Sequence, residues 1–220
     1  MRQEIDLQTY AKRNQYEWFR SFPDPTYGFD VDMDVTRVVL LAKEKGISFF
    51  ESFLYFILLG VNAIPEMRMR EVDGHIYIYD VVHPTFTVMG NDGIYQNAGC
   101  EMKMDFDGFT SIVRKTIEEA KMLPSTQELD RFPMCKEPNV IYATSIPLLS
   151  LKGVRHPTPA YNYDSLSVPR SLFDRYRQES DGTYHCTLNL TVSHTLVDGY
   201  PLANCFKEIQ RRIEALPVFL

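Results

Sequence analysis

Apolar and polar residues alternate most regularly near the end of the chain, in residues 183–193. Successive side chains of a β-strand point to opposite faces, so this alternation predicts a strand with one face buried. The apolar face would carry Tyr184, Cys186, Leu188, Leu190 and Val192. Continuing the alternation places His194 on that same face, at the very end of the strand. We therefore expect an inward-facing imidazole at this position.

A helix is predicted directly after this strand. Asp198, Gly199 and Pro201 open a segment with apolar residues at helical spacing, and proline is tolerated in a first helical turn. The apolar stripe consists of Leu202, Cys205, Phe206, Ile209, Ile213 and Leu216. His194 thus lies at a strand-to-helix junction, where a rigid scaffold holds a side chain and leaves one side open to a ligand.

Two further helices are predicted in the first third of the chain. Asp34 is a suitable N-cap for the first of them, and Gly46 stands where a helix stop is expected. Ser48 or Ser52 would open the second helix, which would end near Ala63. This second helix is apolar on nearly all sides, so we expect it to be deeply buried.

The remaining helices are predicted on either side of this pair. Residues 9–19 suit a short polar-aromatic helix, which the prolines after it would stop. Asp105 or Asp107 would cap a helix reaching about Lys121. Its inward residues would be Phe109, Ile112, Val113 and Ile117. Residues 124–138 are polar and proline-punctuated, which predicts a long loop.

The strongest turn signal in the chain is Asp73-Gly74, a dipeptide that favours a type I′ turn. It separates two short β-rich runs, residues 67–72 and 75–79, and so predicts a hairpin. Other strands are predicted at residues 27–33, 85–89, 140–151 and 160–168.

Composition bounds the kind of protein that this sequence encodes. The 220 residues, 45% of them hydrophobic, suffice for one core, so we expect one domain over residues 1–220. A net charge of −6, without any Lys/Arg cluster longer than a pair, argues against a nucleic acid partner. The apolar run at residues 53–61 is too short for a membrane span, and the N-terminus lacks a signal-peptide pattern. Four irregularly spaced cysteines favour a reducing cytoplasm and give no metal motif.

The function depends on how His194 is interpreted. An inward histidine at a strand end is most often a core residue that is hydrogen-bonded to the backbone. Here the string from His194 to Tyr200 reads His-Thr-Leu-Val-Asp-Gly-Tyr. It resembles the H-x-x-x-D-G signature of the CoA-dependent acyltransferases.

A second set of segments carries the same resemblance. Residues 62–69, Asp73-Gly74, residues 80–84 and residues 86–88 are similar to the chloramphenicol acetyltransferase family at matching spacing. The similarity extends over nearly the whole chain, with a divergent stretch in the middle.

The resemblance implies a two-layer α/β fold in which helices cover a mixed sheet. It also implies a homotrimer whose active sites lie between subunits, with acetyl-CoA as co-substrate and a hydroxyl of a small molecule as acceptor. Chloramphenicol is the family's default acceptor. His194 would be the general base, because an imidazole is largely neutral at cellular pH yet basic enough to assist an alcohol. Neither a covalent acyl-enzyme nor a metal is required.

The resemblance also implies roles for residues near His194. The serine that stabilises the family's oxyanion corresponds to Thr144, with Ser145 as the alternative donor. Asp198 would brace the histidine loop by pairing with a cation of the N-terminal helix, an arginine in the family and here Lys12 or its neighbour Arg13. A lysine lacks the planar fork of the family's arginine. Two other departures from the family are Ser193 and Leu172.

Positions that would contact the two substrates follow from the same resemblance. Pro147 and Tyr176 would flank the adenine of CoA, with Arg175 near the ribose phosphate and Ser48 in place of a family lysine. Trp18, Phe19 and Tyr27 would line the acceptor site, where their rings suit a flat or apolar alcohol.

Three alternatives to this function are relevant. The acceptor could be another alcohol, because fold and signature determine the donor chemistry better than the pocket does. The dihydrolipoamide acyltransferases share the signature, but this chain has no lipoyl-bearing or linker region and resembles the shorter family elsewhere too, which argues against them. A non-catalytic trimer that binds CoA or a small molecule is the third alternative, motivated by Lys12, Thr144 and Leu172.

Overall fold

A seven-stranded mixed β-sheet forms the centre of the computed structural model, which describes residues 1–123 and 131–216. Its strand order is β2-β10-β8-β7-β5-β6, and β9 pairs with β10 beside this path. β7 runs parallel to both β5 and β8, whereas the other pairings described are antiparallel. The strands are β2 (Thr26–Asp34), β5 (His83–Met89), β6 (Tyr95–Gly99), β7 (Val140–Ile146), β8 (Arg170–Asp174), β9 (Arg177–Gln178) and β10 (Tyr184–Ser193).

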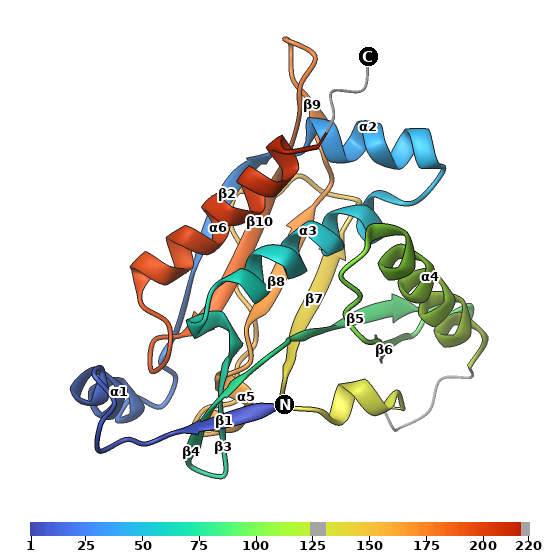
Figure 1. The fold of residues 1–220 in the computed structure, drawn as a ribbon. Helices are drawn as coiled ribbons and strands as arrows, with labels where there is room; N and C mark the ends of the chain where they lie inside the picture. Colours follow the sequence, from blue (N-terminus) through green and yellow to red (C-terminus); the bar gives the residue numbers. More distant parts are fainter. Residues whose placement is uncertain (124–130, 217–220) are drawn as a thin grey trace.

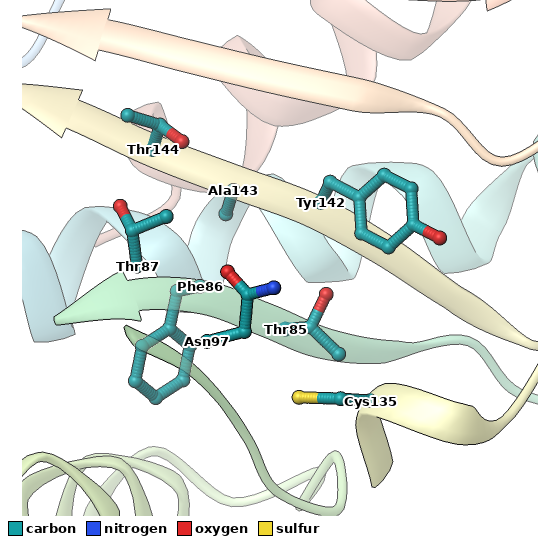
Figure 2. Close-up of a pocket in the computed structure, with 8 residues that line it drawn as sticks. All are labelled: Thr85, Phe86, Thr87, Asn97, Cys135, Tyr142, Ala143 and Thr144. Carbon is teal, nitrogen blue, oxygen red and sulfur yellow. The ribbon is translucent and has the colours of Figure 1, made fainter. Parts of the chain in front are cut away.

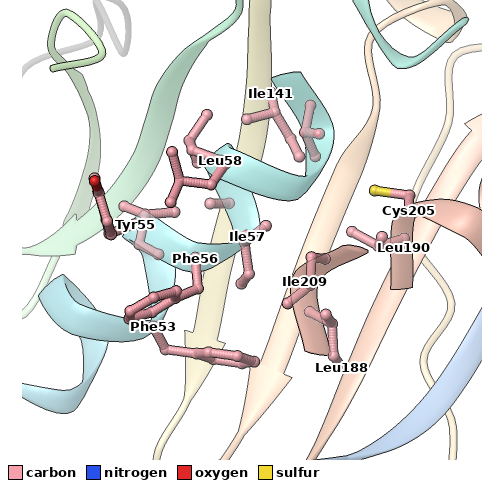
Figure 3. Close-up of a cluster of buried hydrophobic side chains, with 14 of the residues drawn as sticks. Phe53, Tyr55, Phe56, Ile57, Leu58, Ile141, Leu188, Leu190, Cys205 and Ile209 are labelled. Carbon is pink, nitrogen blue, oxygen red and sulfur yellow. The ribbon is translucent and has the colours of Figure 1, made fainter. Parts of the chain in front are cut away.

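Helices of the described residues cover one face of this sheet (Figure 1). They are α2 (Thr36–Lys45), α3 (Phe49–Ala63), α4 (Phe106–Met122) and α6 (Gly199–Glu214). The core lies between these two layers, with α3 at its centre (Figure 3). α3 and α6 cross closely at Gly60, which has no side chain. A Cβ added there would lie 2.2 Å from Ile209 Cγ1. Among the residues described, no helix is long and apolar enough to cross a membrane. The expected two-layer α/β architecture is confirmed.

A small second sheet and one short helix lie beside one end of the large sheet (Figure 1). The small sheet has the order β1-β4-β3, and the helix is α1. Asp73 and Gly74 join β3 to β4 with φ angles of 52° and 81°, both in the positive region that a type I′ turn requires. The predicted hairpin is therefore confirmed. The bounds are β1 (Arg2–Ile5), α1 (Arg13–Arg20), η1 (Glu66–Arg68), β3 (Met69–Val72), β4 (His75–Tyr79), η2 (Pro133–Lys136) and α5 (Tyr163–Leu166).

The helix-capping predictions are resolved by hydrogen bonds. Ser48, rather than Ser52, caps α3 by accepting from the Glu51 amide at 3.1 Å. Asp105, rather than Asp107, caps α4 by accepting from the Gly108 amide. The prediction that Asp34 is the N-cap of α2 is wrong: Val35 holds that position without a side-chain cap, although the Thr36 amide donates to the Asp34 carboxylate at 2.9 Å. α2 ends at Gly46, which adopts the left-handed conformation with φ of 63°.

Several predicted boundaries are wrong. Residues 160–168 do not form a strand; Asn162 caps the short helix α5, and the strand β8 follows at Arg170–Asp174. The sequence pattern did not indicate β8 because both of its faces are mostly buried, which removes the alternation of apolar and polar residues.

Other elements differ in extent from the predictions. The strand predicted over residues 140–151 ends at Ile146, and the first helix begins at Arg13. Strands β1 and β6 were not predicted. Part of the loop predicted over residues 124–138, its residues 124–130, lies outside the described residues; its end contains η2.

The second face of β10 is polar and yet largely buried. Asn189 and Ser193 are each 2% exposed, although the alternation predicted that these residues face water. The chain between β7 and α5 covers this face: the Leu151 carbonyl accepts from the Thr187 hydroxyl, and His156 Nε2 lies 3.1 Å from Asn189 Oδ1. The predicted half-buried strand is thus buried on both sides along its second half.

Candidate active site

His194 directly follows the last residue of β10, at the end of the sheet where α1 lies (Figure 1). Its backbone amide donates to the Pro25 carbonyl at 2.9 Å, which joins the end of β10 to the start of β2. Asp198 is the N-cap residue of α6. The predicted strand-to-helix junction around His194 is therefore present.

Two aromatic rings hold the imidazole of His194. The Phe19 ring stacks on it with centroids 3.8 Å apart and an interplanar angle of 12°, and the Tyr27 ring stacks at 4.5 Å and 30°. Two rings cannot share one face of an imidazole at these distances, so they lie on opposite faces. The Tyr27 hydroxyl donates to the Val197 carbonyl at 3.0 Å. Burial, helped by the charge of Asp198, raises the pKa of Tyr27, so this donor stays protonated.

Lys12 is the cation that pairs with Asp198. Its Nζ lies 2.8 Å from Asp198 Oδ2 and 3.4 Å from Glu66 Oε1. Arg13 pairs instead with Glu17, at 2.7 Å along the exposed side of α1. Burial alone would lower the pKa of Lys12, but its hydrogen bond to Asp198 and the nearby carboxylates outweigh burial and raise this pKa.

The second oxygen of Asp198 faces His194 without a hydrogen bond. His194 Nδ1 lies 3.6 Å from Asp198 Oδ1, which is beyond hydrogen-bond length. Nδ1 is buried, and within residues 1–123 and 131–216 it has no hydrogen-bond partner. The side chain as a whole is 30% exposed, so Nδ1 is the inner nitrogen of a ring that still reaches the surface.

The third predicted acceptor residue, Trp18, is arranged differently from Phe19 and Tyr27. Trp18 is 65% exposed, and its ring packs edge-on against Phe22 with centroids 6.0 Å apart. Phe22 also packs edge-on against Phe19 at 5.6 Å, so it supports the ring that covers His194. Sequence reasoning did not single out Phe22, although it lies in the same aromatic run as Trp18 and Phe19.

Thr144 lies on the polar face of the large sheet and lines a pocket of about 210 Å³ (Figure 2). The lining residues that the structure describes include Thr144 and do not include Ser145, which faces the other side of β7. This placement favours Thr144 over Ser145 as a donor to a bound ligand. The pocket is lined by Thr85, Phe86, Thr87, Asn97, Cys135, Tyr142, Ala143 and Thr144.

The other lining residues of this pocket were not predicted as site residues. They come from β5, β6, β7 and η2, so only the pairing of distant segments brings them together. One local signal pointed to them. Residues with a hydroxyl group stand at every second position, separated by an apolar residue, at Thr85 and Thr87 on β5 and at Tyr142 and Thr144 on β7.

The three residues predicted to contact CoA lie at the same end of the sheet as Thr144. Pro147 follows β7 and Arg175 follows β8, and these parallel strands end at the same edge. The Arg175 amide donates to the Leu149 carbonyl at 3.1 Å, which holds the two loops together. Tyr176 packs edge-on against Phe49 with centroids 4.9 Å apart.

Thr144 and His194 are far apart within one chain. Thr144 pairs with Leu172 across β7 and β8, and Leu172 pairs with Asn189 on β10. His194 lies five positions beyond Asn189 along the same strand direction. At about 3.3 Å per residue and about 4.8 Å per strand, the two side chains are separated by about 20 Å. His194 and Thr144 therefore lie in two separate regions of the described chain.

Comparisons with known proteins agree with this fold. A family model described as chloramphenicol acetyltransferase matches residues 2–210. A chloramphenicol acetyltransferase of Escherichia coli is 24% identical over 94% of this chain and 91% of its own length. One of Clostridium perfringens is 25% identical over 97% of this chain and 99% of its own. A solved chloramphenicol acetyltransferase structure superposes with a TM-score of 0.85 at 21% identity, over 97% of this chain and all of that one.

Proposed function

Because the chain belongs to the chloramphenicol acetyltransferase family, we propose that it is an acetyl-CoA-dependent O-acetyltransferase with His194 as its general base. Its acceptor is a hydroxyl of a small molecule, and chloramphenicol is the first acceptor to test because the curated relatives carry that name. Residues 1–220 act as one acyltransferase domain, in the cytoplasm.

The observation that carries this proposal is the held imidazole of His194. Phe19 and Tyr27 cover both faces of the ring, and Nδ1 is buried next to Asp198. Nε2 is then the nitrogen that can meet a substrate. A core histidine would have both nitrogens bonded to protein groups, whereas this ring is fixed in orientation and 30% exposed.

The proposed reaction proceeds without a covalent intermediate. His194 Nε2 takes the proton of the acceptor hydroxyl while the hydroxyl oxygen attacks the thioester carbonyl carbon of acetyl-CoA. The Thr144 hydroxyl donates a hydrogen bond to the oxyanion that forms. When this intermediate collapses, the carbon–sulfur bond breaks, and the CoA thiolate leaves with the proton from His194. The products are CoA and the acetyl ester of the acceptor.

The active form in this proposal is a homotrimer with each active site between two subunits. Support comes from the separation of about 20 Å between Thr144 and His194 in one chain, which is too long for both to act on one carbonyl. A second copy brings its Thr144 pocket to the His194 of the first. CoA then contacts Pro147, Arg175 and Tyr176 on the Thr144 side, and the acceptor contacts Trp18, Phe19 and Tyr27 on the His194 side.

Thiol release from acetyl-CoA, measured with chloramphenicol and a panel of other alcohols, tests the proposal. We expect release with at least one acceptor and none from a His194→Ala variant. CoA binding without turnover of any acceptor would instead support the non-catalytic trimer. One of the three motives for that alternative is already weaker, because Lys12 does pair with Asp198.

A further inference from the structure

The carboxylate of Asp198 faces two different partners with its two oxygens. Oδ2 lies 2.8 Å from Lys12 Nζ, and Oδ1 lies 3.6 Å from His194 Nδ1. A guanidinium presents a planar fork that binds both oxygens of a carboxylate at once, whereas an ammonium is a point charge that needs only one. The lysine at position 12 therefore leaves Oδ1 available to the histidine.

Lys12 does not depend on Asp198 alone for its position. Glu66, in η1, lies 3.4 Å from the same Nζ, so two carboxylates hold one ammonium between α1 and the N-terminus of α6. This second anchor means that Lys12 can bind a single oxygen of Asp198 and still stay in place.

His194 Nδ1 lacks the partner that a buried nitrogen normally has. It is buried and has no hydrogen bond in the part of the chain that the structure describes, and buried polar atoms are rarely left so. The rings of Phe19 and Tyr27 prevent the imidazole from tilting toward another partner. Hydrogen bonds of catalytic groups are often long before substrate binds and shorten in the complex. A shift of less than 1 Å brings Asp198 Oδ1 within hydrogen-bond distance of Nδ1.

We propose that Asp198 is a positioning residue whose Oδ1 accepts a hydrogen bond from Nδ1 of His194 and so holds the proton of the neutral ring on Nδ1. This inference rests on the proposed function. It gives Asp198 a role beyond the brace that the family resemblance implies. With the proton on Nδ1, Nε2 carries the lone pair that a general base requires.

The charges around the ring are consistent with this role. When Nε2 takes a proton from the acceptor, the imidazolium lies beside the Asp198 carboxylate, and the proton later leaves from Nε2 to the CoA thiolate. Tyr10 and Tyr27 also face this cluster, and burial raises the pKa of both, so they stay neutral. Two carboxylates, Asp198 and Glu66, thus surround one ammonium.

The tautomer can be measured directly by ¹⁵N NMR of the full-length protein with labelled histidine, at pH 8. The chain has five histidines, and a His194→Gln variant assigns the signal of interest by removing it. In the unmodified protein we expect Nδ1 of His194 to carry the proton. In Asp198→Asn we expect the proton to move to Nε2 in part or completely. We also expect the kcat of Asp198→Asn to fall by at least about 100-fold, with little change in KM. A wrong tautomer lowers kcat by roughly 10⁴-fold in a Ser-His-Asp triad, which gives the upper end of the expected loss.

Lys12→Arg separates this proposal from a simple brace. The guanidinium would take both oxygens of Asp198 and deprive Nδ1 of its acceptor. We therefore expect a mixture of tautomers and a kcat lower by about tenfold, the effect of one weakened hydrogen bond. If Asp198 served only as a brace, the better grip of arginine would leave kcat unchanged or raise it.

Glu17→Gln is the matched control. Glu17 is an ion-paired carboxylate on the exposed side of α1, the helix that Lys12 precedes. This variant should change neither the tautomer nor kcat. A proton on Nε2 in the unmodified protein would overturn the proposal, as would a Lys12→Arg variant with unchanged tautomer and undiminished kcat. Because the NMR measurement needs no turnover, it decides the role of Asp198 even if no acceptor is acetylated; absent turnover would count only against the proposed function.

Discussion

A mixture of two inactive variants should recover activity if each active site is shared between subunits. One chain carries His194→Ala and the other carries Thr144→Ala, and the two are co-expressed with different tags so that mixed trimers can be purified. Within a chain the two side chains are about 20 Å apart, so each change damages a different region of the chain. A subunit that lacks His194 still supplies an intact Thr144 to its neighbour, and the reverse also holds.

The expected recovery of activity follows from the fraction of sites that receive both an intact His194 and an intact Thr144. Removing a general base costs about 100- to 10,000-fold, and removing one oxyanion donor costs about 10- to 1,000-fold. Each variant alone is therefore expected at or below about a tenth of the normal rate. When the two chains mix at random in equal amounts, about a quarter of the sites receive both intact residues. The two tags exclude trimers of a single variant, and one of the three sites in each mixed trimer is intact, so the purified mixed trimers should reach about a third of the normal specific activity.

The assay is CoA thiol release by tag-purified mixed trimers, compared with each variant alone and with unmixed trimers combined after purification. The combined but unmixed sample controls for any gain that does not require shared sites. If both residues act within one chain, the mixed trimers can show no more than the average of the two variants. That result, or an active monomer in sedimentation, would refute the shared site.

Three other outcomes are expected. His194→Ala should lower acetyl transfer by about 100- to 10,000-fold and leave folding and acetyl-CoA binding intact, and a folded variant above about a tenth of the normal rate contradicts the mechanism. Burial lowers the pKa of His83, whose Nδ1 accepts a hydrogen bond from the Met102 amide at 2.9 Å. The unfolded state then binds more protons, so the free energy of unfolding in urea should fall below about pH 6.5, and less so in His83→Gln. Gly60→Ala should lower the free energy of unfolding by about 1–3 kcal/mol, because the added Cβ would meet Ile209. Unchanged unfolding in urea would show instead that α3 and α6 can move apart without cost.

Local periodicity accounts for the elements that the sequence predicted well. Apolar residues recur at every second position of β10 and at helical spacing in α6. The junction predicted between these two elements, with His194 directly after the strand, is the one that the structure shows. β8 has no such period, because helices cover one of its faces and Arg170 and Asp174 are buried on the other. The segment around Tyr163 has the composition of a strand but forms a helical turn, since Asn162 accepts from the Ser165 amide.

The candidate site was accessible from the sequence only in part. The signature at His194 is a local string, and the structure stacks Phe19 and Tyr27 on the ring. The choice of Lys12 over Arg13 needed three-dimensional geometry, because one helical position decides which of the two reaches Asp198. The pocket at Thr144 depends on strands that pair across long stretches of chain, and the polar alternation within each strand does not show which strands pair.

The two unlike faces of β10 have a consequence for how this protein can change over generations. A shift of one residue in the register of that strand would exchange its faces, putting Asn189 under α6 and Leu188 on the polar side. The same shift would turn His194 away from its two covering rings. A single inserted or deleted residue in β10 would therefore disturb the core and the imidazole together. The register of β10 fixes the position of the histidine and the packing of the core together, so neither can shift by one residue without the other.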